Sequence, residues 1–454
     1  MYITLRRDTP APGRRALSAV PANVIALGAV SLVTDVSSEM VTAVLPLYLA
    51  LTLGLTPLQL GFVDALSFGV TALLRPAGGR VADRWRHKPV AAAGYALSAL
   101  AKLGVLAAGT ALGPLAAAII ADRTGKGVRT APRDALIASS APAGGEGLAF
   151  GVHRAMDTVG AFLGPLAAFA VLAATGGTYR AVFVVSFCVA AFGVVLLVLY
   201  VRDRPGPTPP VPPLRTVVRD RRLWRMCALA AGLGVFTISD FFVYLLLQRS
   251  GAVPLLYFPL LPLGTAAVYL LLAVPLGRLA DRVGRARVLL GGHLALVAAT
   301  LLLAGATPAA PMVVGVLLLH GLFYASTDGV LMALAAPLLP DSSRTTGLAM
   351  VQTAQASARA VSSLAAGALW AAWGARAALL VMAAGLLAAV LAAARGCDEA
   401  GVARVGGRAR AGRGGHGLHD AHRRIDTGRT ADIPARRAAL LPRRRRPGRL
   451  GLPS

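Results

Sequence analysis

Several ionisable residues of this chain lie inside long apolar segments, where an isolated charge is costly and function is the first explanation. Asp35 and Glu39 are four residues apart and therefore share one face of a helix. Two carboxylates close together in a medium of low dielectric cannot both ionise easily, so one of them can bind and release a proton. We predict that Asp35 carries this proton and that Glu39 is its partner. The alternative is a structural pair neutralised by Arg123 or Arg154.

Charged residues also interrupt three later apolar segments. Arg123 and Lys126 share a helix face, and we predict that Arg123 tunes proton release or holds an anionic substrate. Asp240 and Asp328 lie in two further segments, where a site and a structural role are equally compatible with the sequence. No His, Cys, Asp and Glu residues have metal-site spacing, and no phosphate-binding Gly-x-x-x-x-Gly-Lys-Ser/Thr loop occurs, so we predict neither metal nor cofactor.

The elements that must position these residues are membrane-spanning helices. Apolar residues make up 56% of the 454 residues, charged residues only 15%, and the mean hydropathy is +0.66. A run of about 20 apolar residues crosses a hydrocarbon core roughly 30 Å thick. We predict twelve such helices in an all-α polytopic membrane protein, at residues 24–51, 58–77, 89–109, 112–131, 148–173, 178–201, 223–247, 253–276, 287–306, 311–336, 346–372 and 375–394.

A short charged segment occurs twice in the chain, 198 positions apart, and each copy ends a long apolar run. The copies share a glycine, an aspartate and an arginine, which are Gly79, Asp83 and Arg84 in the first and Gly277, Asp281 and Arg282 in the second. This repetition indicates two related halves. A carboxylate at a helix end can pair with nearby guanidinium groups, so we predict that each copy latches one face of the protein. The alternative is that these arginines only enforce topology.

The chain divides at changes of composition. We predict an N-terminal segment (1–21), a first six-helix bundle (22–201), a proline-rich linker (202–222), a second six-helix bundle (223–395) and a basic, disordered tail (396–454). The tail carries the arginine run 443–446, which suits anionic lipid head groups, and an incidental tail is the alternative. It lacks the aromatic residues expected of a nucleic-acid-binding segment, so no nucleic acid is expected as a partner.

Arginine and lysine gather on alternate loops, on the side that includes both termini. The positive-inside rule then places both termini in the cytoplasm, as an even number of helices requires. We therefore expect a multi-pass protein of the inner (plasma) membrane.

Several motifs resemble those of the major facilitator superfamily over about residues 20–395. Residues 277–285 are similar to the loop motif of that superfamily, although Arg86 stands where the first copy should have glycine. Residues 123–127 are similar to its Arg-x-x-x-Gly signature, and Gly160, Gly164 and Pro165 belong to a segment that resembles its antiporter motif. Residues 34–40 and 122–136 resemble a bacterial branch whose substrates are mostly unassigned.

This resemblance implies two pseudo-symmetric six-helix bundles that move a small molecule by alternating access. In the resembled fold, helices one, four, seven and ten line a central cavity, where the acids and bases above would form one polar site. We predict a transporter that works as a monomer and has no enzymatic activity, with a small-molecule substrate and protons as its partners. Proton-coupled export of a small organic molecule or drug is the first expectation. Uptake of a nutrient, anion or metal-chelate is the alternative, and a non-transporting membrane enzyme or sensor is a remote one.

Overall fold

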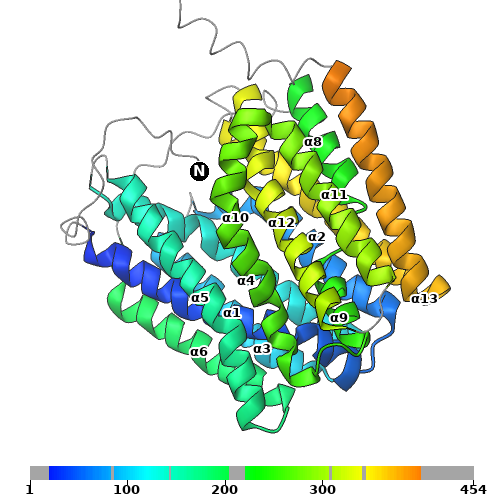
Figure 1. Cartoon of the computed structure of the whole chain (residues 1–454). Coiled ribbons are helices and arrows are strands. Elements are labelled where there is room, and N and C mark those ends of the chain that lie inside the picture. Colours follow the sequence, from blue (N-terminus) through cyan, green and yellow to red (C-terminus); the bar gives the residue numbers. More distant parts are fainter. Residues whose placement is uncertain are drawn as a thin grey trace, which may run out of the picture. The chain divides into compact units, whose positions relative to one another are not determined.

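The computed structural model describes residues 20–82, 86–142, 145–203, 220–305, 309–339 and 344–399. Every regular element within these ranges is a helix (Figure 1). The N-half consists of α1 (Ala22–Leu47, continued by the π-helical η2, Tyr48–Thr52), α2 (Pro57–Ala82), α3 (His87–Ala108), α4 (Leu112–Ser140), α5 (Glu146–Ala174) and α6 (Tyr179–Tyr200). The C-half consists of α8 (Arg221–Gly234), α9 (Asp240–Arg249), η3 (Leu255–Leu260), α10 (Leu261–Val283), α11 (Arg285–Ala304), α12 (Ala310–Ala335), η4 (Ala336–Leu338) and α13 (Arg344–Glu399).

Each predicted apolar segment coincides with helical structure. Nine helices in the described part of the chain are long and apolar enough to cross a membrane. The fourth segment is α4, which carries more charge than the others, and it continues past the predicted end at 131 to Ser140. The last two segments meet at Gly374, where φ is 84° and ψ is 164°. This left-handed backbone suits glycine and turns α13 into two helices, so the predicted pair is confirmed.

The seventh segment differs from the prediction. It was expected to be one helix over 223–247, but α8 ends at Gly234 and α9 begins at Asp240. Side chains satisfy part of the freed backbone, because Thr237 Oγ1 donates to the Leu233 carbonyl at 2.8 Å and Ser362 Oγ donates to the Thr237 carbonyl at 2.8 Å. Asp240 is therefore the first residue of α9 rather than the middle of a continuous helix.

Small residues set the helix crossings that position the polar side chains. A Cβ atom on Gly94 of α3 would lie 2.8 Å from the Gly125 carbonyl oxygen of α4. One on Gly125 would lie 2.8 Å from the Ser98 amide nitrogen, so the two backbones touch. Such close approach is the usual way in which membrane helices gain packing and polar contacts. The crossing holds the charged side of α4 against α3.

Some predicted regions lie outside the described residues. They are residues 1–19, most of the linker (204–219), and residues 400–454 of the tail. The disorder of the tail and its adhesion to anionic lipids therefore stay predictions.

Candidate functional site

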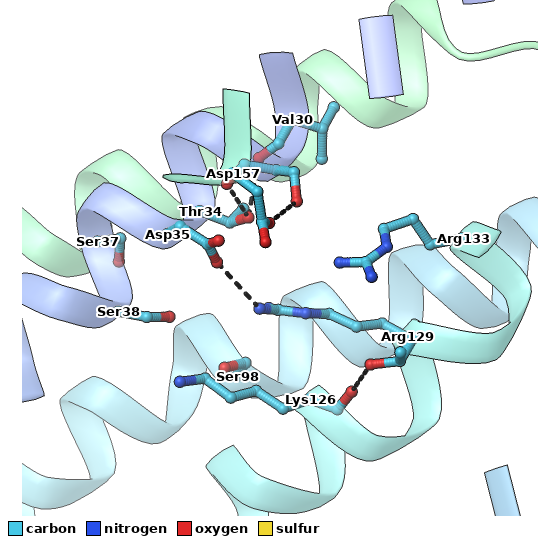
Figure 2. Close-up of polar contacts among 12 residues, drawn as sticks. Val30, Thr34, Asp35, Ser37, Ser38, Ser98, Lys126, Arg129, Arg133 and Asp157 are labelled. Atoms are coloured by element: carbon cyan, nitrogen blue, oxygen red, sulfur yellow. Dashed lines mark hydrogen bonds and ion pairs between the residues drawn. The ribbon is translucent and has the colours of Figure 1, made fainter. Parts of the chain in front are cut away.

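A pair of carboxyl groups lies where α1 and α5 face each other. Asp35 of α1 and Asp157 of α5 are close enough to share a hydrogen bond, and Figure 2 shows the two groups side by side. Two carboxyl groups bond to each other only if one of them holds a proton. Ser31 Oγ, one turn before Asp35 on α1, donates to Asp157 Oδ1 at 2.8 Å. The arrangement places two carboxyl groups where they can share one proton.

Arg129 of α4 is the counter-charge of this pair. Its Nη2 lies 3.9 Å from Asp35 Oδ1, and Figure 2 draws this ion pair between α4 and α1. The Arg129 side chain is only 7% exposed, and its guanidinium group lies over the Tyr95 ring, 4.3 Å from the centroid. Contact with the Tyr95 ring and burial together fix the position of the Arg129 guanidinium group. Sequence reasoning named Arg123 or Arg154 for this role instead of Arg129.

Asp157 has further basic neighbours. Arg154, one turn earlier on α5, donates from Nη1 to Asp157 Oδ2 at 3.1 Å. The Arg133 guanidinium group is directed toward the carboxyl pair from α4 (Figure 2). The pair therefore lies within reach of three arginines. These cations favour the ionised form of the pair.

Glu39 lies on the predicted turn of α1 but is not the group that joins Asp35. It lies one turn along α1 from Asp35, but the carboxyl group that joins Asp35 is that of Asp157. The charged groups that act on Glu39 include Lys126 and Arg123 of α4. The reason is the crossing with α5, which brings Asp157 to the Asp35 level of α1. Glu39 thus faces the second polar cluster of the N-half.

This second cluster lines a pocket between α1, α2, α3 and α4. Ser98 Oγ donates to Asp122 Oδ1 at 2.5 Å, and Arg123 Nε lies 3.7 Å from Asp122 Oδ2. Lys102, with 3% of its surface exposed, donates from Nζ to the Ser98 carbonyl at 3.2 Å. The space of the pocket, about 460 Å³, includes the part that is open to solvent, and its wall includes Lys102, Asp122, Arg123 and Lys126.

The C-half carries its own polar cluster, centred on Asp240. Tyr324 of α12 donates from its hydroxyl group to Asp240 Oδ1 at 2.6 Å. His320, one turn earlier on α12 and fully buried, places Nε2 2.9 Å from the same oxygen. Arg359 of α13 lies over the Tyr324 ring, 5.8 Å from its centroid, and its charge acts on Asp240. The amide groups at the start of α9 add to the positive environment of this carboxylate.

Contacts between the halves run along α2 and α13. Ser363 Oγ of α13 donates to Asp64 Oδ2 of α2 at 2.6 Å. The Ser239 hydroxyl, in the break between α8 and α9, lies beside Asp64 without a hydrogen bond of good geometry. A Cβ atom on Gly61 would lie 3.0 Å from Gly367 Cα, so the two helices touch through their backbones. The sites of the two halves therefore meet at Asp64.

The predicted single cavity site is only partly assembled. The charges of Glu39, Arg123, Asp64 and Asp240 act on one another, which joins α1, α4, α2 and α9. Asp328 stands apart from them, exposed on α12, where its Oδ2 accepts a hydrogen bond of 3.4 Å from the Tyr269 hydroxyl of α10. Asp328 lies one turn beyond Tyr324 on α12, and its charge acts on Arg359.

The repeated charged segment is described only in its second copy. Asp281 lies near the end of α10, and its Oδ1 accepts from Nη2 of Arg285, the first residue of α11, at 3.0 Å. Arg285 also donates from Nη1 to the Ala333 carbonyl of α12 at 2.6 Å. This copy thus ties three helices of the C-half together. Gly277 lies within α10, and Arg282 is exposed. In the first copy Gly79 falls within α2, whereas Asp83 and Arg84 lie outside the described residues.

The glycines of the helix-five segment lie directly against α1. A Cβ atom on Gly160 would lie 2.9 Å from Leu32 Cα, and one on Gly164 would lie 2.9 Å from the Val36 carbonyl oxygen. Pro165 follows inside the same continuous helix. This close approach brings Asp157 to Asp35.

Sequence reasoning missed the residues whose partners come from other helices. Asp64 and Arg129 lie in segments with several polar residues, and their charge inside a predicted helix was the available signal. His320 and Tyr324 are four residues apart, so the helical period places them on one face of a helix, and this was the available signal. Among the described residues, no three His, Cys, Asp or Glu side chains come together as metal ligands.

Comparison with known proteins gives the family. The Major Facilitator Superfamily profile matches residues 27–268 and 259–446. An uncharacterised MFS-type transporter of Methanocaldococcus jannaschii is 27% identical over 359 residues, which span 77% of this chain and 88% of that protein. An uncharacterised protein of Mycobacterium tuberculosis is 37% identical over 157 residues, which span 34% of this chain and 38% of that protein.

Solved structures of transporters share the fold. The crystal structure of the nucleoside transporter NupG has a TM-score of 0.70 at 14% identity and covers 82% of this chain and 98% of that one. A bacterial homologue of the human lysosomal transporter Spinster, in an inward-facing and occupied conformation, has a TM-score of 0.67 at 16% identity and covers 85% of this chain and 98% of that one. The family profile, the relative and the twelve-segment helical fold agree. The chain belongs to the Major Facilitator Superfamily and is a multi-pass membrane transporter rather than an enzyme.

Proposed function

We propose that this chain is a proton-coupled secondary transporter of a small organic solute, and that Asp35 and Asp157 carry the coupling proton together. The observation that supports this proposal most is the closeness of these two carboxyl groups, with Arg129 Nη2 3.9 Å from Asp35 Oδ1. A shared proton leaves one negative charge, which one arginine balances. Loss of the proton adds a second negative charge, which must be met by movement of a cation or of a helix.

Alternating access gives this charge change a mechanical consequence. Asp35 belongs to α1, Asp157 to α5 and Arg129 to α4, so proton loss changes the attraction among three helices of the N-half. Gly160 and Gly164 let α1 and α5 pack through their backbones, so a small rearrangement there is transmitted directly. The proton and the solute then cross the membrane in the same conformational cycle.

The distribution of basic loops supports cytoplasmic termini. With that orientation, the Gly61–Gly367 contact lies toward the outer face, because α2 begins near Gly61 and α13 turns at Gly374. Phe169 near the end of α5 also stacks on Tyr257 of η3, with ring centroids 5.8 Å apart. We therefore propose that the structure is closed toward the outside.

Export is the direction that we propose first, because the segment with Gly160, Gly164 and Pro165 resembles an antiporter motif. Uptake driven by the same proton is the alternative. A pH-sensitive dye inside proteoliposomes reports proton flux when candidate solutes are added. Growth of a deletion strain on candidate solutes and in a panel of drugs then separates uptake from export.

The variants Asp35→Asn and Asp157→Asn test the proton site. We expect each to remove solute-dependent proton flux while the protein remains folded in detergent. Asp203→Asn is a matched control, because Asp203 pairs with exposed Arg86 and lies outside the membrane site. Proton flux at the wild-type rate in both site variants would refute the proposed role of the carboxyl pair.

A further inference from the structure

The pocket between α1, α2, α3 and α4 is lined by hydrophobic side chains on one part of its wall and by polar side chains on the other. Hydrophobic side chains form one part of it and include Val41, Leu45, Val105 and Ile119. Hydroxyl and charged side chains form the other part and include Ser38, Thr42, Ser67, Lys102, Asp122, Arg123 and Lys126. Its space of about 460 Å³ includes the part that is open to solvent. A ligand with an organic body and one polar end fits such a wall.

The polar part of the wall is rich in cations. Lys102, Arg123 and Lys126 line the pocket together with one carboxylate, Asp122. Glu39 is the second carboxylate that acts on Arg123 and Lys126, from the side of α1. Three cations thus face two carboxylates, one of which is already held by the 2.5 Å hydrogen bond from Ser98. Positive charge remains without a counter-ion in a low-dielectric region.

Two of these cations have unused hydrogen-bonding capacity. Arg123 Nε is buried and makes no hydrogen bond, because its nearest carboxylate oxygen is 3.7 Å away. The Lys126 ammonium group makes no hydrogen bond or ion pair with any residue that the structure describes. A cation in a region of low dielectric is strongly disfavoured unless acceptors satisfy it, and within the part of the chain that the structure describes Arg123 has only a long ion pair and Lys126 has none. A native protein keeps such groups where a ligand supplies the missing acceptors.

We propose that this pocket binds the acidic group of an organic anion, a carboxylate or a phosphate, and that this anion is the transported solute. Arg123 and Lys126 supply the donors, and Val41, Leu45 and Ile119 contact the organic part. Glu39 acts on the same two cations, so the bound anion competes with the Glu39 carboxylate. Uptake of a proton by Glu39 relieves this competition, which links anion binding to the proton. The transport part rests on the proposed function, whereas binding does not.

Binding is tested on the purified full-length protein in detergent, by the shift of its unfolding temperature with four probes at equal ionic strength. The probes are benzoate and phenyl phosphate, with benzyl alcohol and benzylammonium as neutral and cationic counterparts of similar size. We expect the two anions to raise the unfolding temperature in a saturable way and the other two to have little effect. A stronger shift with benzoate or with phenyl phosphate identifies the carboxylate or the phosphate as the preferred group.

Variants locate the site. We expect Lys126→Gln and Arg123→Gln to weaken anion binding at least about tenfold, and Lys126→Arg to retain it because the charge is kept. Lys88→Gln is the control, since the Lys88 ammonium is exposed and donates to the Val198 carbonyl. Stabilisation by benzylammonium alone, no shift with either anion, or an unchanged anion affinity in Lys126→Gln would overturn the proposal. Asp35→Asn should keep anion binding, so failure of proton coupling and failure of this site give different results.

Discussion

The hydroxyl group of Ser363 donates a hydrogen bond of 2.6 Å to Asp64 Oδ2, and this bond joins the two halves of the transporter. Ser363 is 1% exposed on α13, one turn from Arg359 and one turn from Gly367. Its partner lies on α2, one turn from Gly61 and one turn from Phe68, over whose ring Arg359 lies. The bond therefore connects a backbone contact between the halves with the polar cluster around Asp240.

The first prediction concerns closure of this contact. A Cβ atom on Gly367 would lie 2.6 Å from the Pro57 carbonyl oxygen and 2.9 Å from Gly61 Cα, and backbone cannot move aside as a flexible side chain does. We expect Gly367→Val to separate α2 from α13 and to reduce transport at least about tenfold. Spin labels at the exposed positions Leu58 and Trp373 should report a longer distance than in the unsubstituted protein.

A matched control uses the same pair of helices. A Cβ atom on Gly69 would lie 3.9 Å from the Ala360 Cβ, which is ordinary contact, so Gly69→Ala should leave the label distance and the transport rate unchanged. An unchanged label distance in Gly367→Val would show that this crossing does not hold the halves together.

The second prediction concerns Arg129 and its carboxylate. Arg129→Gln removes one partner of a largely buried ion pair, and we expect a loss of about 3 kcal/mol in stability together with loss of proton flux. Asp35→Asn removes the other partner. The double variant should lose less stability than the sum of the single variants, by about 1 kcal/mol or more. Unfolding of the four proteins in detergent measures this coupling, and strict additivity would mean that the pair contributes nothing.

The fold was predictable because its determinants are local. A run of apolar residues specifies a membrane helix wherever it occurs, and the repeated segment indicated two related halves. The break before Asp240 was not visible in this way, since residues 235–239 are apolar or small and polar like the rest of the segment. Its stability depends on Ser362, which lies far away in sequence.

The types of residue that form the site were predictable, but which of them contact each other was predictable only in part. Helical spacing correctly put Asp35 and Glu39 on neighbouring turns of α1, but which carboxyl group joins Asp35 depends on how α5 crosses α1. The same limit explains why Arg129 was overlooked in favour of Arg123. Four cations of α4 are candidates by spacing, and only the crossing with α3 at Gly94 decides which one faces Asp35.

The third prediction concerns the Asp240 cluster. Tyr324→Phe removes the hydroxyl group that donates to Asp240 at 2.6 Å, and a hydrogen bond to a charged group contributes about 1.5–3 kcal/mol. We expect the unfolding temperature to fall accordingly. Tyr269→Phe is the control, because its 3.4 Å contact with exposed Asp328 is long and should contribute little. Equal falls in the unfolding temperatures of the two variants would indicate that the short hydrogen bond to Asp240 stabilises the protein no more than the long one to Asp328.

The fourth prediction compares two alanine substitutions on α5 that differ only in the space around them. A Cβ atom on Gly164 would lie 2.5 Å from the Glu39 Cβ and 2.9 Å from the Val36 carbonyl oxygen, whereas one on Gly151 would meet nothing within 4 Å. We expect Gly164→Ala to cost about 1–3 kcal/mol by overpacking and to displace α1, so that proton flux also falls. Gly151→Ala should be neutral, or stabilising by up to about 1 kcal/mol, because alanine loses less backbone entropy in a helix. Unfolding temperatures and proton flux of the two variants check this prediction. Equal stability of the two variants would mean that α1 can move away from α5 at Gly164 without loss of stability.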